Sequence, residues 1–484
     1  MLVWTPLVSD YPQTWDEVQY ILAVREFDVE KHQPHPPGYY LHVRTAGIAH
    51  AVGLNERESL ISVSMLAGAV FVGLVVWWVG EVAGSPAAIA AAALTVSSPL
   101  VITAATEGRT YMTGALGAAV IGYLSWRMLR GDSRWVIPSA IAVALTAGFR
   151  PTTAVFLLPL WVWALVQSGW RPALTGVAAA GLATTIWVMP FLAEVGGLAH
   201  FMDLSARLGG PVSESSPLHG GGVAALATNL KRLGSGLALL VGVGIVGVVR
   251  GLRSSLTEST WWLLLWILPA LAFFLLMHTG TPLYAMVFAA PLLAVVSAGL
   301  AEIGRAMVSD KREPVLTLAI VVLIQGSLIY GNVVRERGRA DSNFAEIKEA
   351  LQPLADDRTV ALVTTGGEQE AAEGYLPFRH AGYLLPDAHL YYFPLEVPGP
   401  VGRLPNSMHK HSTYLVAPPV VHEDVRHLLL LGGGLRKFLP ETCALRLVYE
   451  AAGFDASLVR VEPNHIVRLD RDGSLRMIRE DTRW

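Results

Sequence analysis

Long apolar runs constrain the fold of this chain more than any other feature of its sequence. A membrane-spanning helix needs about 20 mostly apolar residues. About ten stretches approach that length, at 59–80, 86–104, 111–129, 135–149, 151–168, 172–193, 233–249, 260–278, 281–301 and 315–332. Phe149-Arg150-Pro151 divides 135–168 into two short spans or one re-entrant pair. We therefore predict a mainly α-helical, polytopic membrane protein with about ten transmembrane helices.

Composition supports a membrane protein and excludes other classes. The chain is 52% hydrophobic and only 15% charged, whereas soluble domains are about 25% charged. Its net charge of -3 and lack of a basic patch give no reason to expect a nucleic-acid partner. A single cysteine, Cys443, excludes an intrachain disulfide framework and a cysteine-based zinc site.

Basic residues in the short loops predict the orientation of the chain. If successive spans cross the membrane in alternating directions, one set of basic loop residues lies on the same side: Arg127, Arg130, Arg134, Arg171, Arg250, Arg253, Arg305, Lys311 and Arg312. By the positive-inside rule this side is cytoplasmic. The opposite side receives 1–58, 106–110, 149–151, 194–232, 278–282 and all residues after 332. We expect a multi-pass protein of the plasma membrane with these loops outside the cytoplasm.

Three domains are predicted from these patterns. Residues 1–58 form the first external loop, 59–332 the helical bundle, and 333–484 an extracytoplasmic α/β domain, since the composition there turns mixed. In this last domain we expect an amphipathic helix at 344–354, a buried strand at 359–364 and alternating strand residues at 457–469.

Asp16 and Glu17 form the first candidate site. Because the two residues are adjacent, their side chains point in different directions, so we expect one to react and the other to position. A partly desolvated carboxylate at the membrane surface is a competent general base for a hydroxyl. The alternative is purely structural: both acids begin an interfacial helix, 15–27, capped by Thr14.

A proline-rich turn follows at His35-Pro36-Pro37-Gly38. Proline fixes its own φ and pushes the preceding residue toward extended conformations, so the turn interrupts the helices and a new helix begins near Tyr39. His35 and Tyr39 are candidate substrate-binding residues. The aromatic residues here also suit an interfacial belt without chemistry.

Three further candidates, Glu107, Arg109 and Tyr111, stand in a very short loop between two spans. Charged groups so close to hydrocarbon are costly unless they are paired or functional, so either a site or a local Glu107–Arg109 ion pair explains them. Arg150, at a helix break, is well shaped to grip a phosphate with two hydrogen bonds. The loop at 106–110 and the helix break at 149–151 are both predicted to lie on the external side.

His278 and Tyr284 flank the last external turn of the bundle and complete the candidates. A structural histidine is the stronger interpretation of His278 taken alone. His32, His35 and His42 lie close together in sequence, but no metal-ligand spacing accompanies them. We therefore predict no metal site and identify no cofactor, and the sequence does not support the alternative of a divalent metal.

The order of these motifs resembles that of the GT-C glycosyltransferases related to protein O-mannosyltransferases and lipid A aminoarabinose transferases (family 39). The resemblance rests on Asp16-Glu17, Tyr20, the 35–39 turn and Glu107-Gly-Arg-Thr-Tyr111, and it extends over roughly residues 14–300. Members of that group begin with a transmembrane helix before the Asp-Glu loop, whereas the segment Met1–Pro12 is too short and too polar to form one.

This resemblance implies an inverting transfer of a monosaccharide from a polyprenyl-phosphate donor to a hydroxyl acceptor on a protein, lipid or glycan of the cell envelope. Asp16 would be the catalytic base, with Glu17 and His35 in support, and Arg109 and Arg150 would hold the lipid phosphate. The alternatives are a polysaccharide polymerase or ligase that uses a lipid-linked saccharide, and a non-catalytic lipid-binding or transport protein. A transporter would predict repeat symmetry between halves, which the sequence does not show.

Overall fold

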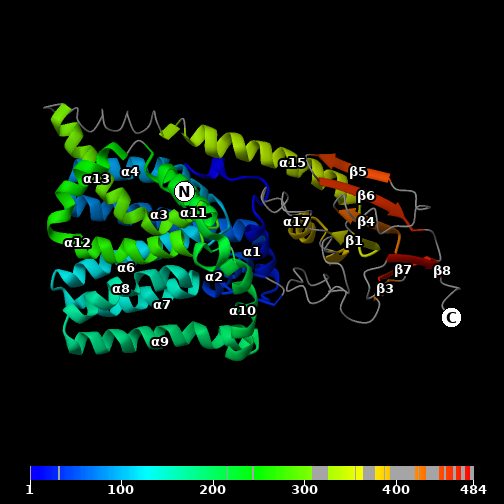
Figure 1. Cartoon of the computed structure of the whole chain (residues 1–484), viewed down its shortest axis with the longest axis horizontal. Coiled ribbons are helices and arrows are strands. Elements are labelled where there is room, and N and C mark those ends of the chain that lie inside the picture. The colour runs from blue at the N-terminus through cyan, green and yellow to red at the C-terminus, as the bar shows by residue number, and fades with distance from the viewer. Residues whose placement is uncertain are drawn as a thin grey trace. The chain divides into compact units, whose positions relative to one another are not determined.

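The structure, a computed structural model, is mostly helical (Figure 1). It describes residues 2–30, 33–214, 216–242, 245–307, 325–326, 328–354, 356–363, 377–385, 387–392, 420–422, 425–431, 446–451, 454–461, 465–469 and 475–479.

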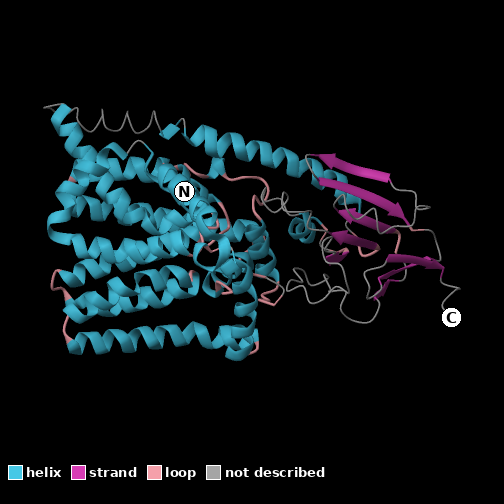
Figure 2. Cartoon of the chain, viewed as in Figure 1, coloured by secondary structure: helices cyan, strands magenta, loops and turns pink. Residues whose placement is uncertain are grey.

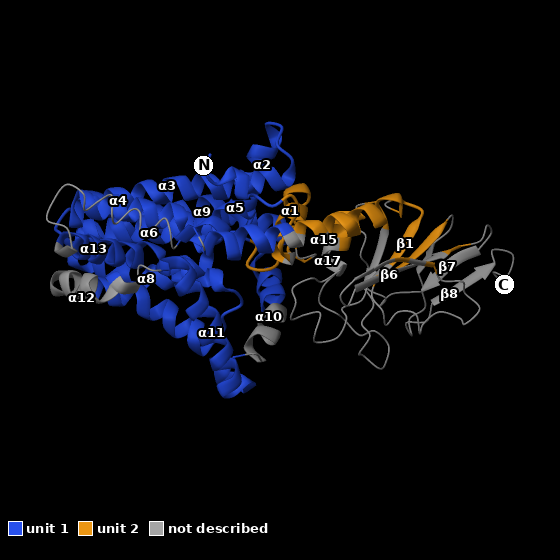
Figure 3. Cartoon of the chain, turned by 90° about the horizontal axis from the view of Figure 1, so that it is seen from above, with its two compact units in different colours: residues 1–9, 39–338 blue, residues 10–38, 339–484 orange. Residues whose placement is uncertain are grey.

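The chain forms two compact units, shown in different colours in Figure 3. The bundle unit comprises Met1–Ser9 and Tyr39–Gly338, and the sheet unit comprises Asp10–Gly38 and Arg339–Trp484. The predicted first loop, 1–58, is therefore shared between the two units. Asp16, Glu17 and His35 belong to the sheet unit, whereas the other candidate residues belong to the bundle unit.

The bundle unit is built almost entirely of helices (Figure 2). Its α-helices are α2 Tyr40–Ala51, α3 Glu56–Ala83, α4 Ser85–Ser97, α5 Pro99–Thr106, α6 Tyr111–Leu129, α7 Val136–Phe149, α8 Pro151–Gln167, α9 Trp170–Val195, α10 Leu198–Glu214, α11 Gly222–Val241, α12 Ile245–Leu276 and α13 Ala289–Met307. Short 3-10 or π segments are η1 Thr5–Leu7, η2 Ser133–Trp135, η3 Pro217–Gly221, η5 Pro282–Phe288 and η6 Tyr330–Arg335. The helix α15, Glu336–Leu351, begins in this unit and continues into the sheet unit.

Local sequence explains where several of these helices begin. Asn55 and Glu58 form a reciprocal capping box at the start of α3, which satisfies two backbone N–H groups that the helix leaves unpaired. Arg150 has an extended backbone, and Pro151 takes the first position of α8, where its missing N–H costs nothing. The predicted break at 149–151 is thus the junction between α7 and α8.

The part of the chain that is described has three helices long and apolar enough to span a membrane: Glu56–Ala83, Trp170–Val195 and Pro282–Arg305. α4 and α5 make a fourth if their 56° bend lies within one span. Shorter apolar helices are Ser133–Phe149, Pro151–Gln167 and Trp261–Leu276. The count of about ten spans stays a prediction, and most of the expected span at 315–332 lies outside the described residues.

One predicted span differs from the structure. The apolar run 233–249 is divided between α11 and α12, with Gly242 at the end of α11. Gly242 has a φ of 51°, a left-handed conformation that glycine adopts without steric cost. Because the apolar composition continues through this break, hydropathy alone does not reveal it.

Close packing around a tryptophan fixes the middle of the bundle. The Trp266 indole is fully buried, and its ring occupies the space where a Cβ on Gly122 of α6 would lie. Its Nε1 donates a hydrogen bond to the carbonyl of Val287 at 2.9 Å. Trp266 therefore ties α12 to η5, and η5 carries the candidate Tyr284.

Within its described residues, the sheet unit contains α1, Trp15–Arg25, part of α15, η7 Gln352–Leu354, α17 Pro377–Leu384 and eight strands. The strands are β1 Thr359–Val363, β2 His389–Tyr392, β3 Val420–His422, β4 His427–Leu431, β5 Arg446–Ala451, β6 Phe454–Arg460, β7 His465–Leu469 and β8 Leu475–Arg479. The order of the larger sheet is β2-β1-β4-β6-β5, and β3-β7-β8 form a smaller one.

Parallel pairing at the centre of the larger sheet matches its apolar strands. β1 pairs in parallel with β2 and with β4, and Val360 lies opposite Leu428. Both side chains are fully buried, as the continuous apolar sequence of such strands indicates. The strand predicted at 359–364 is β1, whereas the alternating run 457–469 is divided between β6 and β7.

Candidate functional site

The candidates of the bundle unit gather around Arg150, at the junction of α7 and α8. The guanidinium carbon of Arg150 lies 4.1 Å from the centre of the Tyr111 ring and 5.6 Å from that of Tyr284. Its Nη1 donates a hydrogen bond to the Thr110 hydroxyl at 2.6 Å. These contacts join the start of α6, the start of α8 and η5. Three segments that are distant in sequence therefore fix the position of the Arg150 guanidinium group.

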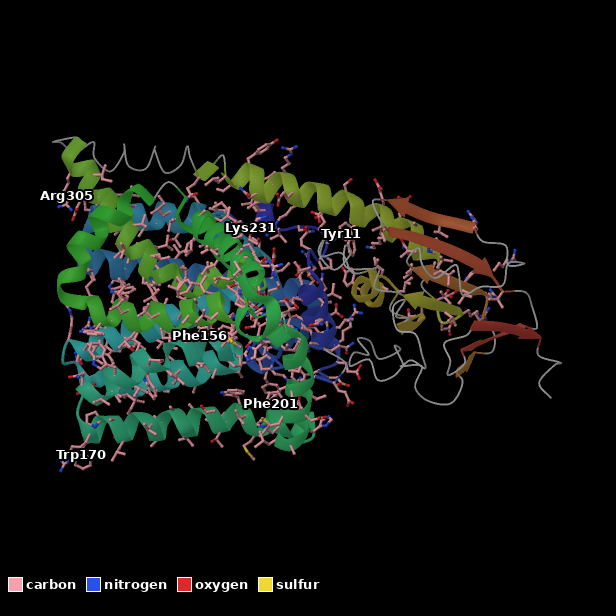
Figure 4. The ribbon with its side chains drawn as sticks, viewed as in Figure 1. Tyr11, Phe156, Trp170, Phe201, Lys231 and Arg305 are labelled. Atoms are coloured by element: carbon pink, nitrogen blue, oxygen red, sulfur yellow. The ribbon has the colours of Figure 1, made fainter. Side chains whose placement is uncertain are left out.

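A pocket lies beside this cation. It is narrow and partly open to solvent, and it is lined by Tyr111, Arg150 and Tyr284. Its apolar walls come from Phe156, labelled in Figure 4, and from Phe274, Leu283 and Val287. A cation and two aromatic rings beside apolar walls suit an anionic group attached to an apolar chain.

Glu107 and Arg109 form a buried ion pair, as one of the two sequence interpretations predicted. Arg109 Nε donates to Glu107 Oε2 at 2.7 Å, and its guanidinium carbon lies 5.1 Å from the centre of the Tyr111 ring. A second arginine, Arg337 at the start of α15, lies 3.4 Å from the other carboxylate oxygen. Arg337 also donates to the Thr106 hydroxyl at 2.7 Å and to the Leu7 carbonyl. One buried carboxylate thus joins two buried guanidinium groups.

His42 of α2 supports the same short loop. Its Nε2 lies 3.1 Å from the carbonyl oxygen of Gly108, so the neutral ring donates from Nε2. Complete burial, together with the positive charge of Arg150, lowers the pKa of His42 from 6.5 to about 4. At neutral pH His42 is therefore an uncharged donor that holds the residue between Glu107 and Arg109.

His278 lies next to Tyr284, with ring centres 6.3 Å apart. Burial lowers the pKa of His278, and the nearby Arg232 lowers it further. Arg232 donates to the carbonyl of Thr279 at 3.0 Å, and the backbone N–H of Thr279 donates to Asn229 at 3.0 Å. The contacts around this turn join it to α11. His278 is therefore a neutral ring beside Tyr284, one of the residues that line the pocket.

The candidates of the sheet unit gather on the first turns of α1. His35 Nδ1 lies 2.5 Å from Gln19 Oε1 and 3.8 Å from Asp16 Oδ1. The His35 ring is also close to Tyr20, with centres 6.4 Å apart. Asp16 and Gln19 are three residues apart and so share a face of α1. The structure thus places the Asp16 carboxylate beside the ring of His35.

Glu17 has the contacts of a helix cap. Its side chain is fully buried, and Oε2 accepts the backbone N–H of Gln13 at 3.0 Å. Its own N–H donates to the Thr14 hydroxyl at 3.3 Å, the N-cap that the sequence predicted. Tyr39, in the bundle unit, is the N-cap residue of α2 and has a φ of 44°. That left-handed conformation is uncommon outside glycine.

Metal ligands do not gather in the parts of the chain that the structure describes. These residues contain no group of three or more His, Cys, Asp or Glu side chains placed to hold an ion. His32, one of the three histidines considered, lies outside the described residues.

Sequence reasoning missed Arg337, His42 and Gln19 as parts of these two groups. Arg337 is 230 residues from Glu107, and no local pattern connects them. His42 follows Tyr39 on α2 and was considered only as a metal ligand. The sequence gives a partial indication for Gln19, because this residue lies one turn after Asp16 on a helix that the sequence predicted.

Comparison with known proteins agrees with the predicted class. The model of the dolichyl-phosphate-mannose-protein mannosyltransferase family matches residues 35–193. No curated protein matches the sequence. The structure is similar to ArnT from Cupriavidus metallidurans in the apo state, with a TM-score of 0.57 and 13% identity over 94% of this chain and 96% of that one.

Two further structures are similar at low identity. ArnT from Cupriavidus metallidurans bound to undecaprenyl phosphate has a TM-score of 0.56 and 11% identity, over 94% of this chain and 96% of that one. The apo oligosaccharyltransferase of Archaeoglobus fulgidus has a TM-score of 0.41 and 14% identity, over 68% of this chain and 52% of that one.

Together these findings agree with the class that the sequence predicts. Its fold is ArnT-like, and the predicted resemblance to GT-C glycosyltransferases of the family 39 type is confirmed. The family match over residues 35–193 and the ArnT-like fold agree with a glycosyltransferase of this class, and the described residues include three helices long and apolar enough to span a membrane.

Proposed function

We propose that the protein transfers a monosaccharide from a polyprenyl-phosphate donor to a hydroxyl acceptor, with inversion at the anomeric carbon. The observation that carries this proposal is Arg150, which stacks against Tyr111 and Tyr284 beside a pocket with apolar walls. A guanidinium group binds phosphate oxygens in a planar, two-pronged geometry. The apolar walls suit the polyprenyl chain next to that phosphate.

The reaction needs a base and stabilisation of a leaving phosphate. The acceptor oxygen forms a bond to the anomeric carbon, while the bond between that carbon and the phosphate oxygen breaks. The phosphate leaves with the electron pair, and the acceptor proton passes to the base, which we assign to Asp16. Since the leaving group is already a stable anion, no general acid is required. Cationic side chains oppose its developing charge.

Each remaining candidate receives a role that its contacts support. Arg150 binds the donor phosphate, and Arg109, oriented by Glu107, adds positive potential. Tyr111 and Tyr284 hold the Arg150 guanidinium group, and His278 is a neutral neighbour of Tyr284. Glu17 and His35 support α1 and Asp16, while Tyr39 shapes the start of α2.

Membranes that contain the full chain, incubated with a panel of labelled polyprenyl-phosphate monosaccharides, test this proposal. We expect transfer from at least one donor, and we expect Asp16→Asn to abolish it without lowering the amount of protein in the membrane. Asp28→Asn is a matched control, because Asp28 lies beyond the end of α1 and its Oδ1 accepts a local turn hydrogen bond from the Glu30 backbone N–H at 2.9 Å. Transfer by Asp16→Asn at the wild-type rate would remove Asp16 as the base.

A separate experiment tests the orientation. We propose that the loops around Arg109 and Arg150, and the sheet unit, lie outside the cytoplasm, as the basic residues of the opposite loops indicate. A reporter fused after Trp484 should then be active only outside the cytoplasm. A reporter that is active in the cytoplasm would contradict this orientation.

A further inference from the structure

Asp341 of α15 holds the segment that leads into α1. Its Oδ2 accepts the backbone N–H of Asp10 at 3.1 Å, and its Oδ1 accepts that of Tyr11 at 3.3 Å. The same Oδ1 accepts the side-chain amide of Gln13 at 3.0 Å. The Asp341 carboxylate, 331 positions from Asp10 in the sequence, therefore accepts three hydrogen bonds from residues 10–13. Hydrogen bonds to a charged acceptor are stronger than neutral ones.

Aromatic packing continues this attachment along α15. The Tyr11 ring stacks on Phe344, with centres 4.9 Å apart and an angle of 27° between the planes. The Nζ of Lys348 lies 5.5 Å from the centre of the Tyr11 ring. Asp341, Phe344 and Lys348 follow the i, i+3, i+7 spacing of one helix face. Tyr11 is thus bound through its backbone and through its ring.

The attachment reaches Asp16 through the cap of α1. Gln13 donates its side-chain amide to Asp341 and its backbone N–H to Glu17 Oε2. Thr14 then caps α1, and Asp16 follows in the first turn. Because both the side-chain amide and the backbone N–H of Gln13 are hydrogen-bonded, the start of α1 has little freedom to move away from α15. The position of the Asp16 carboxylate depends on this start.

We propose that Asp341 is a positioning residue for Asp16, so that the sheet unit fixes the geometry of the proposed base. This inference rests on the base role assigned to Asp16. It also gives α15, which carries Asp341, a part in the reaction. The competing explanation is that Asp341 only stabilises the fold, as a carboxylate that accepts backbone N–H groups commonly does.

A matched control separates the two explanations. Asp356 also accepts a backbone N–H, from Arg358 at 3.2 Å, and a side-chain hydroxyl, from Thr359 at 2.9 Å. These contacts serve the turn before β1 and do not involve the 10–13 segment. Asp341→Ala and Asp356→Ala therefore remove similar bonds from the same unit, but only the first releases the segment before α1.

Kinetics and hydrogen exchange are measured on the full chain in detergent or membranes. For Asp341→Ala we expect kcat to fall at least about tenfold with little change in the donor KM, since the proposed base is displaced while the donor pocket is unchanged. Amide exchange at Asp10 and Tyr11 should become about tenfold faster or more, because these two backbone N–H groups lose their acceptor. Asp341→Asn keeps one acceptor oxygen and should give intermediate values.

The outcomes distinguish this inference from the proposed function. If Asp16→Asn abolishes transfer and Asp341→Ala has the kcat of Asp356→Ala, the positioning role is wrong and the base role stands. Faster exchange at Asp10 and Tyr11 with unchanged kcat would likewise overturn the positioning role. If Asp16→Asn transfers sugar at the wild-type rate, the base role itself fails, whatever Asp341→Ala shows.

Discussion

The guanidinium group of Arg150 lies 4.1 Å from the ring centre of Tyr111, the first residue of α6. This relationship joins two motifs that are 39 residues apart in the sequence, at positions 111 and 150. A guanidinium group over an aromatic face is held by the ring quadrupole and still presents N–H groups at its edge. In the function proposed above, Arg150 is thereby oriented before the phosphate arrives, which would reduce the entropy lost on binding.

Replacing Arg150 should weaken donor binding strongly. Arg150→Gln removes a charge-assisted contact worth about 1.5–3 kcal/mol, so we expect kcat/KM for the donor to fall about 10- to 150-fold. Arg150→Lys should recover only part of it, because an ammonium group lacks the planar fork. Kinetics at varied donor concentration measure this. Arg134→Gln is the control, since Arg134 is 83% exposed in η2 and pairs with Asp132. Equal losses in the two Gln variants would contradict the assignment.

Gly114 should be intolerant of a side chain because of the same arginine. A Cβ at Gly114 would lie 2.6 Å from Arg150 Cδ and 3.1 Å from the Thr153 hydroxyl. Gly114→Ala should therefore displace Arg150 and lower transfer about tenfold, which corresponds to about 1.4 kcal/mol. Gly73→Ala, in α3, is the matched control, because a Cβ there meets no atom within 4 Å. Wild-type transfer by Gly114→Ala would show that the position of Arg150 is not critical.

Local signals in the sequence predicted the pieces of the candidate site well. The Arg150-Pro151 break, the Thr14 cap and the Glu107–Arg109 pair are all found. Each depends on residues within four positions of one another, for which dihedral preferences and helix caps are sufficient. The expected strand at 359–364 is found for the same reason, as a continuous apolar run.

Contacts between distant segments could not be predicted in this way. Arg337 meets Glu107 across 230 positions, and Asp341 meets Asp10 across 331. Neither pair has a periodic or motif signal, since only the folded chain brings the partners together. The assignment of residues 10–38 to the sheet unit follows from contacts of the same kind, so a division based on apolar runs could not anticipate it.

His42 should make stability depend on pH. Burial lowers its pKa from 6.5 to about 4, so between these values the unfolded state binds a proton that the folded state excludes. Stability should therefore fall as pH drops from about 6.5 to 4, by up to about 3 kcal/mol, and this contribution is fully present above 6.5. Thermal unfolding across pH 4 to 7.5 measures it. His42→Gln keeps a donor for Gly108 and should flatten this slope, whereas His50→Gln, in the same helix, should retain it.

Glu107 and Arg337 should be strongly coupled. Glu107→Gln leaves two buried arginines without their carboxylate, and removing one partner of a buried ion pair costs about 3–5 kcal/mol. In a double-mutant cycle of Glu107→Gln and Arg337→Leu, we expect a coupling energy of about 1–3 kcal/mol, measured from the free energies of unfolding. The same cycle with Asp132→Asn and Arg134→Leu should show weaker coupling, because solvent screens the exposed Arg134. Coupling at Glu107 no larger than at Asp132 would mean that the buried carboxylate does not bind the two arginines into one network.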